Sequence, residues 1–225
     1  MKGTLVEYGE ENFRILREKR RRAKELMEVL ESSGLQSIAY GSIARGDVNS
    51  RSDVDIFIPH QVPSFKVELA LDGFDVLEKR IVQATPNYAI KGEIVIDEQA
   101  TISFPLVKMK ERELEFYRFG GCVSYEQLLE DLRVPGVDKR LSLIIPNEKG
   151  HIEIPISEIH PSVVAKTLGV SIDIVLERIR VLSRRREVGR TGIYLCEKIP
   201  VTASFESVLR EIVSKNPAIR RRFED

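Results

Sequence analysis

Apolar residues recur every three or four positions between Glu10 and Ser33, and this spacing predicts one long helix. The residues that share this face are Phe13, Leu16, Ala23, Leu26, Met27 and Leu30. Ser32, Ser33 and Gly34 give the helix a C-terminal stop signal. Residues 19–22 form a basic run on the same helix, which we interpret as a solvated face paired with nearby glutamates rather than a nucleic-acid contact.

A change of pattern follows this helix. Ser37–Tyr40 is a short apolar run typical of a strand, and Gly41-Ser42 breaks it. A short helical stretch at Ile43–Arg45 and a turn-rich segment at Gly46–Ser52 come next. Asp53–Ile58 then alternates polar and apolar residues, which predicts a second strand.

The middle of the chain predicts further helices and two hairpins. A short helix is expected at Phe65–Leu71, whereas Phe74–Ile81 fits either a helix or a strand. A hairpin is expected at Asn87–Phe104, with its turn near Asp97. A helix is expected at Lys108–Phe119, and its apolar face would consist of Met109, either Leu114 or Phe116, and Tyr117. The last two elements are a helix at Gln127–Leu132, opened by a capping box at Ser124, and a hairpin formed by Arg140–Ile145 and His151–Ile156. We interpret the second hairpin as a scaffold between domains.

The last third has a different character. Helices are expected at Ser157–Leu168 and Ser171–Arg185, joined by Gly169-Val170, and this arrangement resembles a helix-turn-helix. A turn at Glu187–Gly192 and a strand at Ile193–Cys196 extend the resemblance to a winged helix with residues 189–192 at the wing tip. A final helix is expected at Phe205–Phe223, with Ile212 and Val213 on its core side. We therefore divide the chain into domains at 1–150 and 151–225.

The winged-helix resemblance implies that the second helix enters a nucleic-acid groove. Its candidate DNA or RNA contacts are Arg178, Arg184, Arg185 and Arg190. The alternative is a small helical module that packs on the first domain or mediates dimerisation, because arginines at a helix C-terminus also compensate the helix dipole without any ligand. A homodimer is compatible with the sequence, which does not determine the oligomeric state.

Composition narrows the function classes. The 225 residues are 42% hydrophobic and 31% charged with zero net charge, so any nucleic-acid binding has to come from a local basic patch. No long apolar run and no signal-peptide pattern occur, so we expect a cytoplasmic protein without a membrane partner. The two cysteines are expected to be free thiols, and the three histidines form no zinc motif.

The richest chemistry lies in Gly41–Ile58. A strand period of two places Asp53 and Asp55 on one face, where two carboxylates can bind a hard cation such as Mg²⁺ or Mn²⁺. Gly41 and Ser42 stand at a strand-to-helix junction, where free backbone N–H groups can bind a phosphate. Together these two halves predict a metal–triphosphate site.

This stretch resembles the signature of the DNA polymerase beta-type nucleotidyltransferase superfamily, a Gly-Ser followed about ten residues later by Asp-x-Asp. Arg45, Gly46, Ser52 and Asp53 make it most similar to the minimal members, and the resemblance covers about residues 37–104. It implies an α/β fold with a mixed sheet, metal binding by Asp53 and Asp55, and NTP binding by Gly41, Ser42, Arg45 and Ser52. The implied reaction moves a nucleotidyl group from an NTP to a hydroxyl of an RNA end, a protein or a small alcohol, with release of pyrophosphate.

The family also places a third carboxylate on a neighbouring strand, and three positions compete for it. Glu93 and Asp97 are acidic, whereas Ser103 would leave the acid missing. A missing acid favours a different class of protein, a nucleic-acid-binding regulator whose degenerate domain senses a nucleotide. A third class, a purely structural module, predicts no nucleotide binding. Arg118, Lys139 and Arg140 are candidate triphosphate contacts among which the sequence does not choose.

Overall fold

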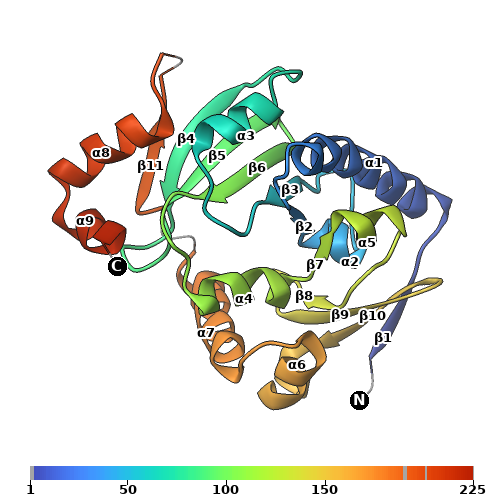
Figure 1. Ribbon diagram of the computed structural model, residues 1–225. Helices are drawn as coiled ribbons and strands as arrows, with labels where there is room; N and C mark the ends of the chain where they lie inside the picture. The colour runs from blue at the N-terminus through green and yellow to red at the C-terminus, as the bar shows by residue number, and fades with distance from the viewer. Residues whose placement is uncertain (1–2, 190–191, 201, 225) are drawn as a thin grey trace.

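A seven-stranded mixed sheet forms the centre of the protein (Figure 1). The computed structural model describes residues 3–189, 192–200 and 202–224. The strand order is β11-β4-β5-β6-β3-β2-β7, and only the β3–β6 pair is parallel. The strands are β2 (Ile38–Tyr40), β3 (Val54–Phe57), β4 (Glu78–Gln83), β5 (Lys91–Asp97), β6 (Ala100–Pro105), β7 (Cys122–Ser124) and β11 (Leu195–Lys198). The mixed α/β class expected from the sequence is confirmed.

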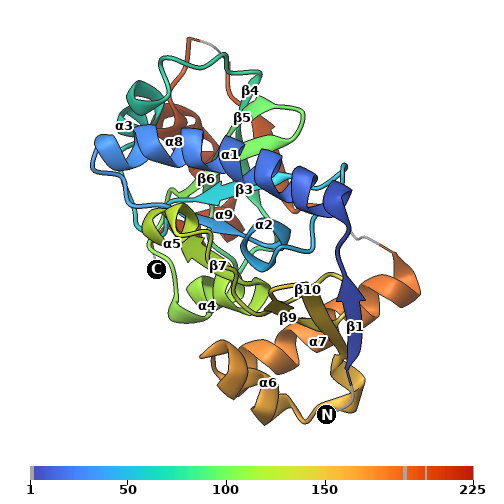
Figure 2. The same ribbon diagram turned by 90° about the vertical axis from the view of Figure 1, so that its right-hand side faces the viewer.

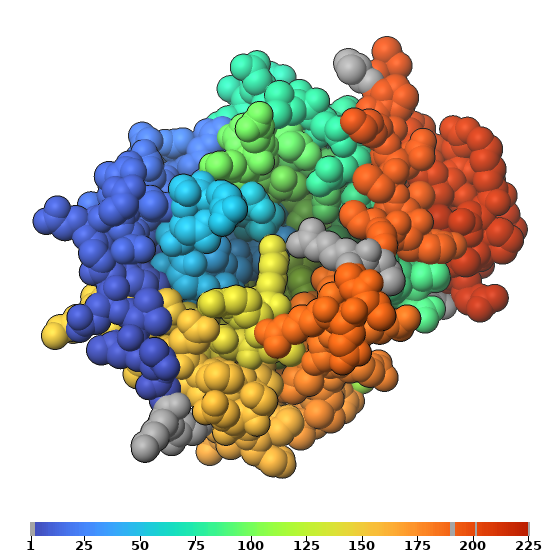
Figure 3. Space-filling model, turned by 180° about the vertical axis from the view of Figure 1, so that it is seen from behind, coloured from blue at the N-terminus to red at the C-terminus, as the bar shows by residue number. Residues whose placement is uncertain are grey.

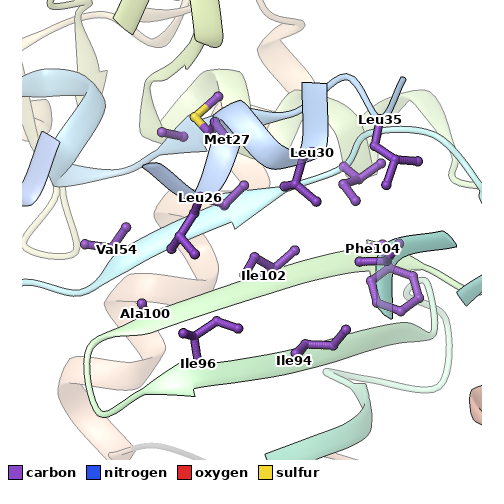
Figure 4. Close-up of a cluster of buried hydrophobic side chains, with 14 of the residues drawn as sticks. Leu26, Met27, Leu30, Leu35, Val54, Ile94, Ile96, Ala100, Ile102 and Phe104 are labelled. Atoms are coloured by element: carbon purple, nitrogen blue, oxygen red, sulfur yellow. The ribbon is translucent and has the colours of Figure 1, made fainter. Parts of the chain in front are cut away.

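Helix α1 (Glu10–Ser32) covers one face of this sheet, as its apolar period predicts. Leu26 and Leu30 point from α1 toward the strands, where Val54 and Ile102 meet them in the core (Figure 4). Two short helices, α2 (Ser42–Arg45) and α3 (Ser64–Ala70), also lie where they are expected. The end of the ambiguous segment Phe74–Ile81 becomes part of strand β4, which lies between β11 and β5.

Helix α4 (Glu111–Gly120) buries only part of the apolar face that its sequence predicts, because Tyr117 is buried whereas Leu114 and Phe116 are half-buried. Its buried residues are Glu113, Glu115, Tyr117 and Phe119. Glu113 forms an ion pair with Arg222 at 3.0 Å, and the Glu115 carboxylate accepts hydrogen bonds from the Ser171 N–H and hydroxyl. The prediction is therefore confirmed for Tyr117 but misses the two buried glutamates, because later parts of the chain enclose α4 and supply polar partners that periodicity does not reveal.

A second sheet lies beside the first and has the antiparallel order β1-β10-β9-β8. Its strands are β1 (Thr4–Glu7), β8 (Gly136–Val137), β9 (Ser142–Asn147) and β10 (Gly150–Pro155). The expected β9–β10 hairpin is confirmed, and a short 3₁₀ turn (Ile156–Glu158) leads from it to α6 (Pro161–Leu168) and α7 (Ile172–Val188). Figure 2 shows this sheet together with α6 and α7 below α1. The helix after Ser124, α5 (Tyr125–Leu129), starts two residues earlier than expected.

The expected wing strand has a different role. β11 pairs antiparallel with β4, Cys196 opposite Val82, so it is an edge strand of the main sheet. The boundary expected at residue 150 falls inside the β9–β10 hairpin, where Gly150 pairs with Asn147. Residues after 150 therefore contribute strands to both sheets, unlike the separate winged-helix arrangement that we expected.

The expected last helix is divided into α8 (Phe205–Lys215) and α9 (Pro217–Glu224). Asn216 between them is extended because proline disfavours the helical conformation in the preceding residue. Ile212 and Val213 are partly buried against the core, but Phe205 and Ile219 are buried more deeply. In the described ranges, no helix is long and apolar enough to cross a membrane. Cys122 and Cys196 are free thiols, as expected.

Candidate functional site

The two aspartates of the motif lie on the sheet face opposite α1. Val54 and Ile56 point into the core under α1, so the strand period turns Asp53 and Asp55 away from it. Asp53 is exposed and Asp55 is half-buried. Neither carboxylate has a hydrogen-bond or ion-pair partner among the described residues. A pair of acidic groups without structural partners is available to a ligand.

The glycine turn stands next to these carboxylates. Gly41 has φ +80°, a conformation that favours glycine, and its N–H donates to the Gly121 carbonyl at 2.8 Å. A Cβ added at Gly41 would meet no atom within 4 Å, so the turn faces open space. Ser42 follows as the first residue of α2, and in the described part of the chain its hydroxyl has no partner.

The electrostatic environment of Asp55 is unfavourable to its charge. Burial raises the pKa of the Asp55 carboxyl to about 6, and the nearby charge of Asp53 adds to this shift. The positive charges of Lys139 and Lys91 oppose the rise in the pKa, whereas the negative charge of Glu93 adds to it. The folded protein therefore holds a carboxylate where its charge costs free energy, which is typical of functional sites.

Strand register decides between the candidates for the third carboxylate. Phe57 on β3 pairs with Ser103 on β6, and Ser103 pairs in turn with Glu93 on β5. The strand beside the aspartates thus carries Ser103, whose hydroxyl donates to the Ile56 carbonyl at 3.3 Å. Glu93 lies one strand further away and binds Arg80 at 2.7 Å.

Asp97 lies elsewhere. A β-bulge between Val95 and Asp97 shifts the register, and the Asp97 carboxylate pairs with Arg22 of α1 at 3.0 Å. Among the residues that the structure describes, no three Asp, Glu, His or Cys side chains are grouped so that they could hold a metal ion. In the described part of the chain, Asp53 and Asp55 are thus a pair of carboxylates, and Glu93 lies one strand further away.

Two expected nucleotide contacts have structural partners instead. Arg45 is buried, its guanidinium binds both carboxylate oxygens of Asp47 at 2.9 Å, and it also donates to the Gly120 carbonyl. The Ser52 hydroxyl accepts the Asn49 N–H at 2.9 Å and closes the loop before β3. Both residues thus have a structural role in the loop between α2 and β3, and their contact with a nucleotide stays a prediction.

Replacement of Arg45 by lysine is therefore expected to reduce stability more than nucleotide affinity. Lysine keeps the charge but cannot form the planar two-oxygen contact with Asp47. We expect a loss of about 1–2 kcal/mol in the free energy of unfolding, measured by urea denaturation. Nucleotide affinity that falls more than tenfold in a variant of unchanged stability would contradict this assignment.

Arg20 was assigned to a solvated face, and this interpretation is wrong. Arg20 is buried and donates to the carbonyls of Ile43 at 3.2 Å and Leu132 at 2.6 Å, so α1 fixes the position of α2. The sequence contains a signal for this contact, because Arg20 lies four residues after Leu16 and three before Ala23, on the apolar stripe itself.

Sequence reasoning also missed the other residues on the site face. Lys91 on β5 is half-buried, and its Nζ lies 3.5 Å from the Tyr117 hydroxyl. Tyr117 stacks on Phe57 with ring centroids 3.9 Å apart and meets Tyr40 edge to face. Burial lowers the pKa of Lys91 and raises the pKa of both tyrosines well above their usual value. Alternation places Lys91 on the same face as Glu93, and the charge of Lys91 opposes the raised pKa of Asp55, so the two side chains are within electrostatic range.

The nucleic-acid candidates occupy different environments. Arg178 is partly buried between α7 and α4, with its guanidinium 4.9 Å from the centre of the Phe116 ring, and burial lowers its pKa. Arg178 therefore lies in the contact between helices α4 and α7. Arg184 and Arg185 are exposed near the C-terminal end of α7, and Arg190 lies outside the described residues.

Figure 3 shows a hollow on the face turned away from the viewer of Figure 1. The segment around residues 41–55 (cyan) and the middle strands (green) border it on one side. The segment after β8 (yellow) and the end of α7 (orange) border it on the other. The motif residues and the basic end of α7 thus surround one depression.

Comparison with known proteins finds a family similarity. No curated protein and no solved structure matches the chain. The family model described as a nucleotidyltransferase domain matches residues 16–118, which run from α1 to the last turn of α4 and include Gly41, Ser42, Asp53 and Asp55. Over this segment the chain is similar to the nucleotidyltransferase domain family, and the general activity supported by the match is nucleotidyl transfer.

Proposed function

We propose that this protein binds an NTP together with Mg²⁺ and transfers its nucleotidyl group to an acceptor hydroxyl. The observation that carries the proposal is the pair of unpartnered carboxylates, Asp53 and Asp55, beside the open turn at Gly41. The raised pKa of Asp55 supports it, because a charge held at a cost in stability needs a function to retain it.

The donor set suits a hard cation. Asp53 and Asp55 offer carboxylate oxygens, the ligands that Mg²⁺ and Mn²⁺ prefer, and Mg²⁺ usually takes its other ligands from water and substrate phosphates. When bound, the ion neutralises negative charge on the NTP phosphates. Gly41 leaves space for the phosphates to approach the backbone, and the Ser42 hydroxyl donates a hydrogen bond to a phosphate oxygen.

The proposed reaction is a substitution at phosphorus. The acceptor oxygen forms a bond to the α-phosphorus, and the bond from that phosphorus to the bridging oxygen of the β-phosphate breaks. Pyrophosphate leaves, and the acceptor hydroxyl loses its proton to solvent. The residues of the site contribute by holding the phosphates in line with the acceptor.

A label-transfer assay tests the proposal. The protein is incubated with each α-labelled NTP and Mg²⁺ or Mn²⁺, with RNA, protein and small alcohols as separate acceptors. We expect label on one acceptor class, and we expect Asp53→Asn with Asp55→Asn to lower the rate by about a thousandfold or more. Equal transfer by the double variant would refute the assignment of these carboxylates.

A second candidate function is nucleotide sensing by a nucleic-acid-binding regulator. It is favoured by Ser103 on the strand beside Asp55, where a third acid was expected, and by the exposed Arg184 and Arg185. This function predicts saturable binding of Mg²⁺–NTP without pyrophosphate release. It also predicts duplex or RNA binding that weakens with salt and with neutral replacements of both arginines.

A further inference from the structure

The turn after β8 is held in place by its first residue. The Asp138 carboxylate accepts the N–H groups of Arg140 at 2.8 Å and Ser142 at 2.9 Å, and it pairs with the Arg140 guanidinium at 2.7 Å. The backbone adds two bonds across the same turn, from Asp138 to Ser142 and from Leu141 to Asp138. Asp138 itself is buried. The turn is therefore rigidly defined.

Leu141 gives the turn an unusual backbone. Its φ of +62° is disfavoured for a bulky side chain, and only one other described non-glycine residue, Asp131, has a positive φ. The Leu141 side chain is buried in the second core, and its carbonyl accepts the Ile156 N–H at 2.9 Å. Surrounding contacts thus maintain a strained conformation, as happens where a loop must present a side chain precisely.

Lys139 is the side chain that this turn presents. It is exposed, and within the described ranges it has no hydrogen-bond or ion-pair partner. Its charge lowers the pKa of Asp55, which places it within electrostatic range of the carboxylate pair. In Figure 3 the yellow segment that contains it projects into the hollow between the motif residues and the end of α7.

The other two candidate cations are less suited to a ligand. Arg140 is occupied by Asp138 and by Glu153 at 3.1 Å. Arg118 lies in the last turn of α4, where its charge partly opposes the burial that raises the pKa of Cys122, so it stands beside the edge strand β7. The structure therefore distinguishes Lys139 from both.

We propose that Lys139 binds the β- and γ-phosphates of the NTP held by Asp53 and Asp55. This inference rests on the proposed function. An NTP carries about four negative charges, and one divalent ion neutralises only half of them. The two aspartates are themselves negative, so the remaining positive charge has to come from another residue. A lysine from the second sheet provides a charge that the motif itself lacks, and a compact ammonium suits phosphates that also contact a metal.

Binding measurements separate this role from a structural one. Calorimetry is carried out with Mg²⁺–ATP, Mg²⁺–GTP and the nucleoside monophosphates on the full chain and on Lys139→Gln. We expect triphosphate affinity to fall about ten- to a hundredfold and monophosphate affinity to stay within about twofold. Lys139→Arg is expected to retain most of the affinity because the charge remains.

Lys149→Gln is the matched control. Lys149 is an exposed lysine in the turn between β9 and β10, at the other end of β9 from Lys139. We expect its replacement to change neither the triphosphate affinity nor the monophosphate affinity. A Lys139→Gln variant that binds triphosphates like the wild type would overturn the role of Lys139 and leave the proposed function intact. A wild-type protein that binds no triphosphate would overturn both.

Discussion

Asp55→Asn is expected to unfold at a higher denaturant concentration than the wild type above pH 6 and to lose metal-dependent nucleotide binding. The pKa of Asp55 is raised from its ordinary value of 3.8 to about 6 in the folded protein. The folded state therefore holds the proton more tightly than the unfolded state, and ionisation of Asp55 destabilises the fold. Two pKa units correspond to about 2–3 kcal/mol, so removal of the charge should recover up to that amount.

The difference in stability between the wild type and Asp55→Asn is expected to depend on pH. Below pH 3.8 Asp55 is protonated in both states, so wild type and variant should have similar stability. Between pH 4 and 6 the wild type loses stability relative to Asp55→Asn, and above pH 6 the difference is constant. Urea unfolding at half-unit pH steps measures this difference. Asp72→Asn, an exposed aspartate, is the control and should show none of it.

The same variant tests the function, because an amide is a poor ligand for Mg²⁺. We expect affinity for Mg²⁺–ATP to fall about a hundredfold or more. Asp53→Asn should also bring the pKa of Asp55 closer to its ordinary value, since the Asp53 charge contributes to the shift. An Asp55→Asn protein that is less stable than the wild type at pH 7 would show that the carboxylate has a structural role.

Arg222→Met is expected to cause a large loss of stability. Arg222 and Glu113 are 3% and 6% exposed and form an ion pair at 3.0 Å, and Arg222 also donates to the Lys108 carbonyl at 2.8 Å. Loss of the arginine leaves the Glu113 carboxylate buried without a counter-charge, which costs about 3–5 kcal/mol. Urea or thermal unfolding at pH 7 measures the change.

Two companion variants make the result interpretable. Arg221→Met alters the exposed neighbour on the same helix and should change stability by less than about 0.5 kcal/mol. Arg222→Met combined with Glu113→Gln removes both charges and should recover part of the loss. If the double variant is no more stable than Arg222→Met alone, the cost arises from lost packing and not from the unpaired carboxylate.

Elements defined by local patterns could be predicted from the sequence. α1, the β2–α2–β3 motif and both hairpins follow from periodicity and turn residues within short windows. β1 and the position of β11 could not be found this way, because their partners β10 and β4 are distant in the chain. β8 could not be found either, because a strand of two residues contains too few positions to show a period.

The site shows the same division. Asp53, Asp55 and Gly41 follow from the motif, but the Arg45 side chain is held by Asp47 nearby and also by a carbonyl 75 residues away, which the motif does not reveal. Alternation alone places Glu93 and Asp97 on one face, and the bulge before Asp97 removes that relation. Lys139 required the fold, because nothing near it in sequence connects its turn to the aspartates of the first sheet.

The pairing of Val82 with Cys196 has a consequence for biosynthesis. While the ribosome is still making the second sheet, β4 is an outer strand with a free row of backbone donors and acceptors. Such an edge invites pairing with another nascent chain until β11 emerges and covers it. A truncated protein that ends near residue 118, where the family similarity ends, would keep this edge open permanently and should aggregate.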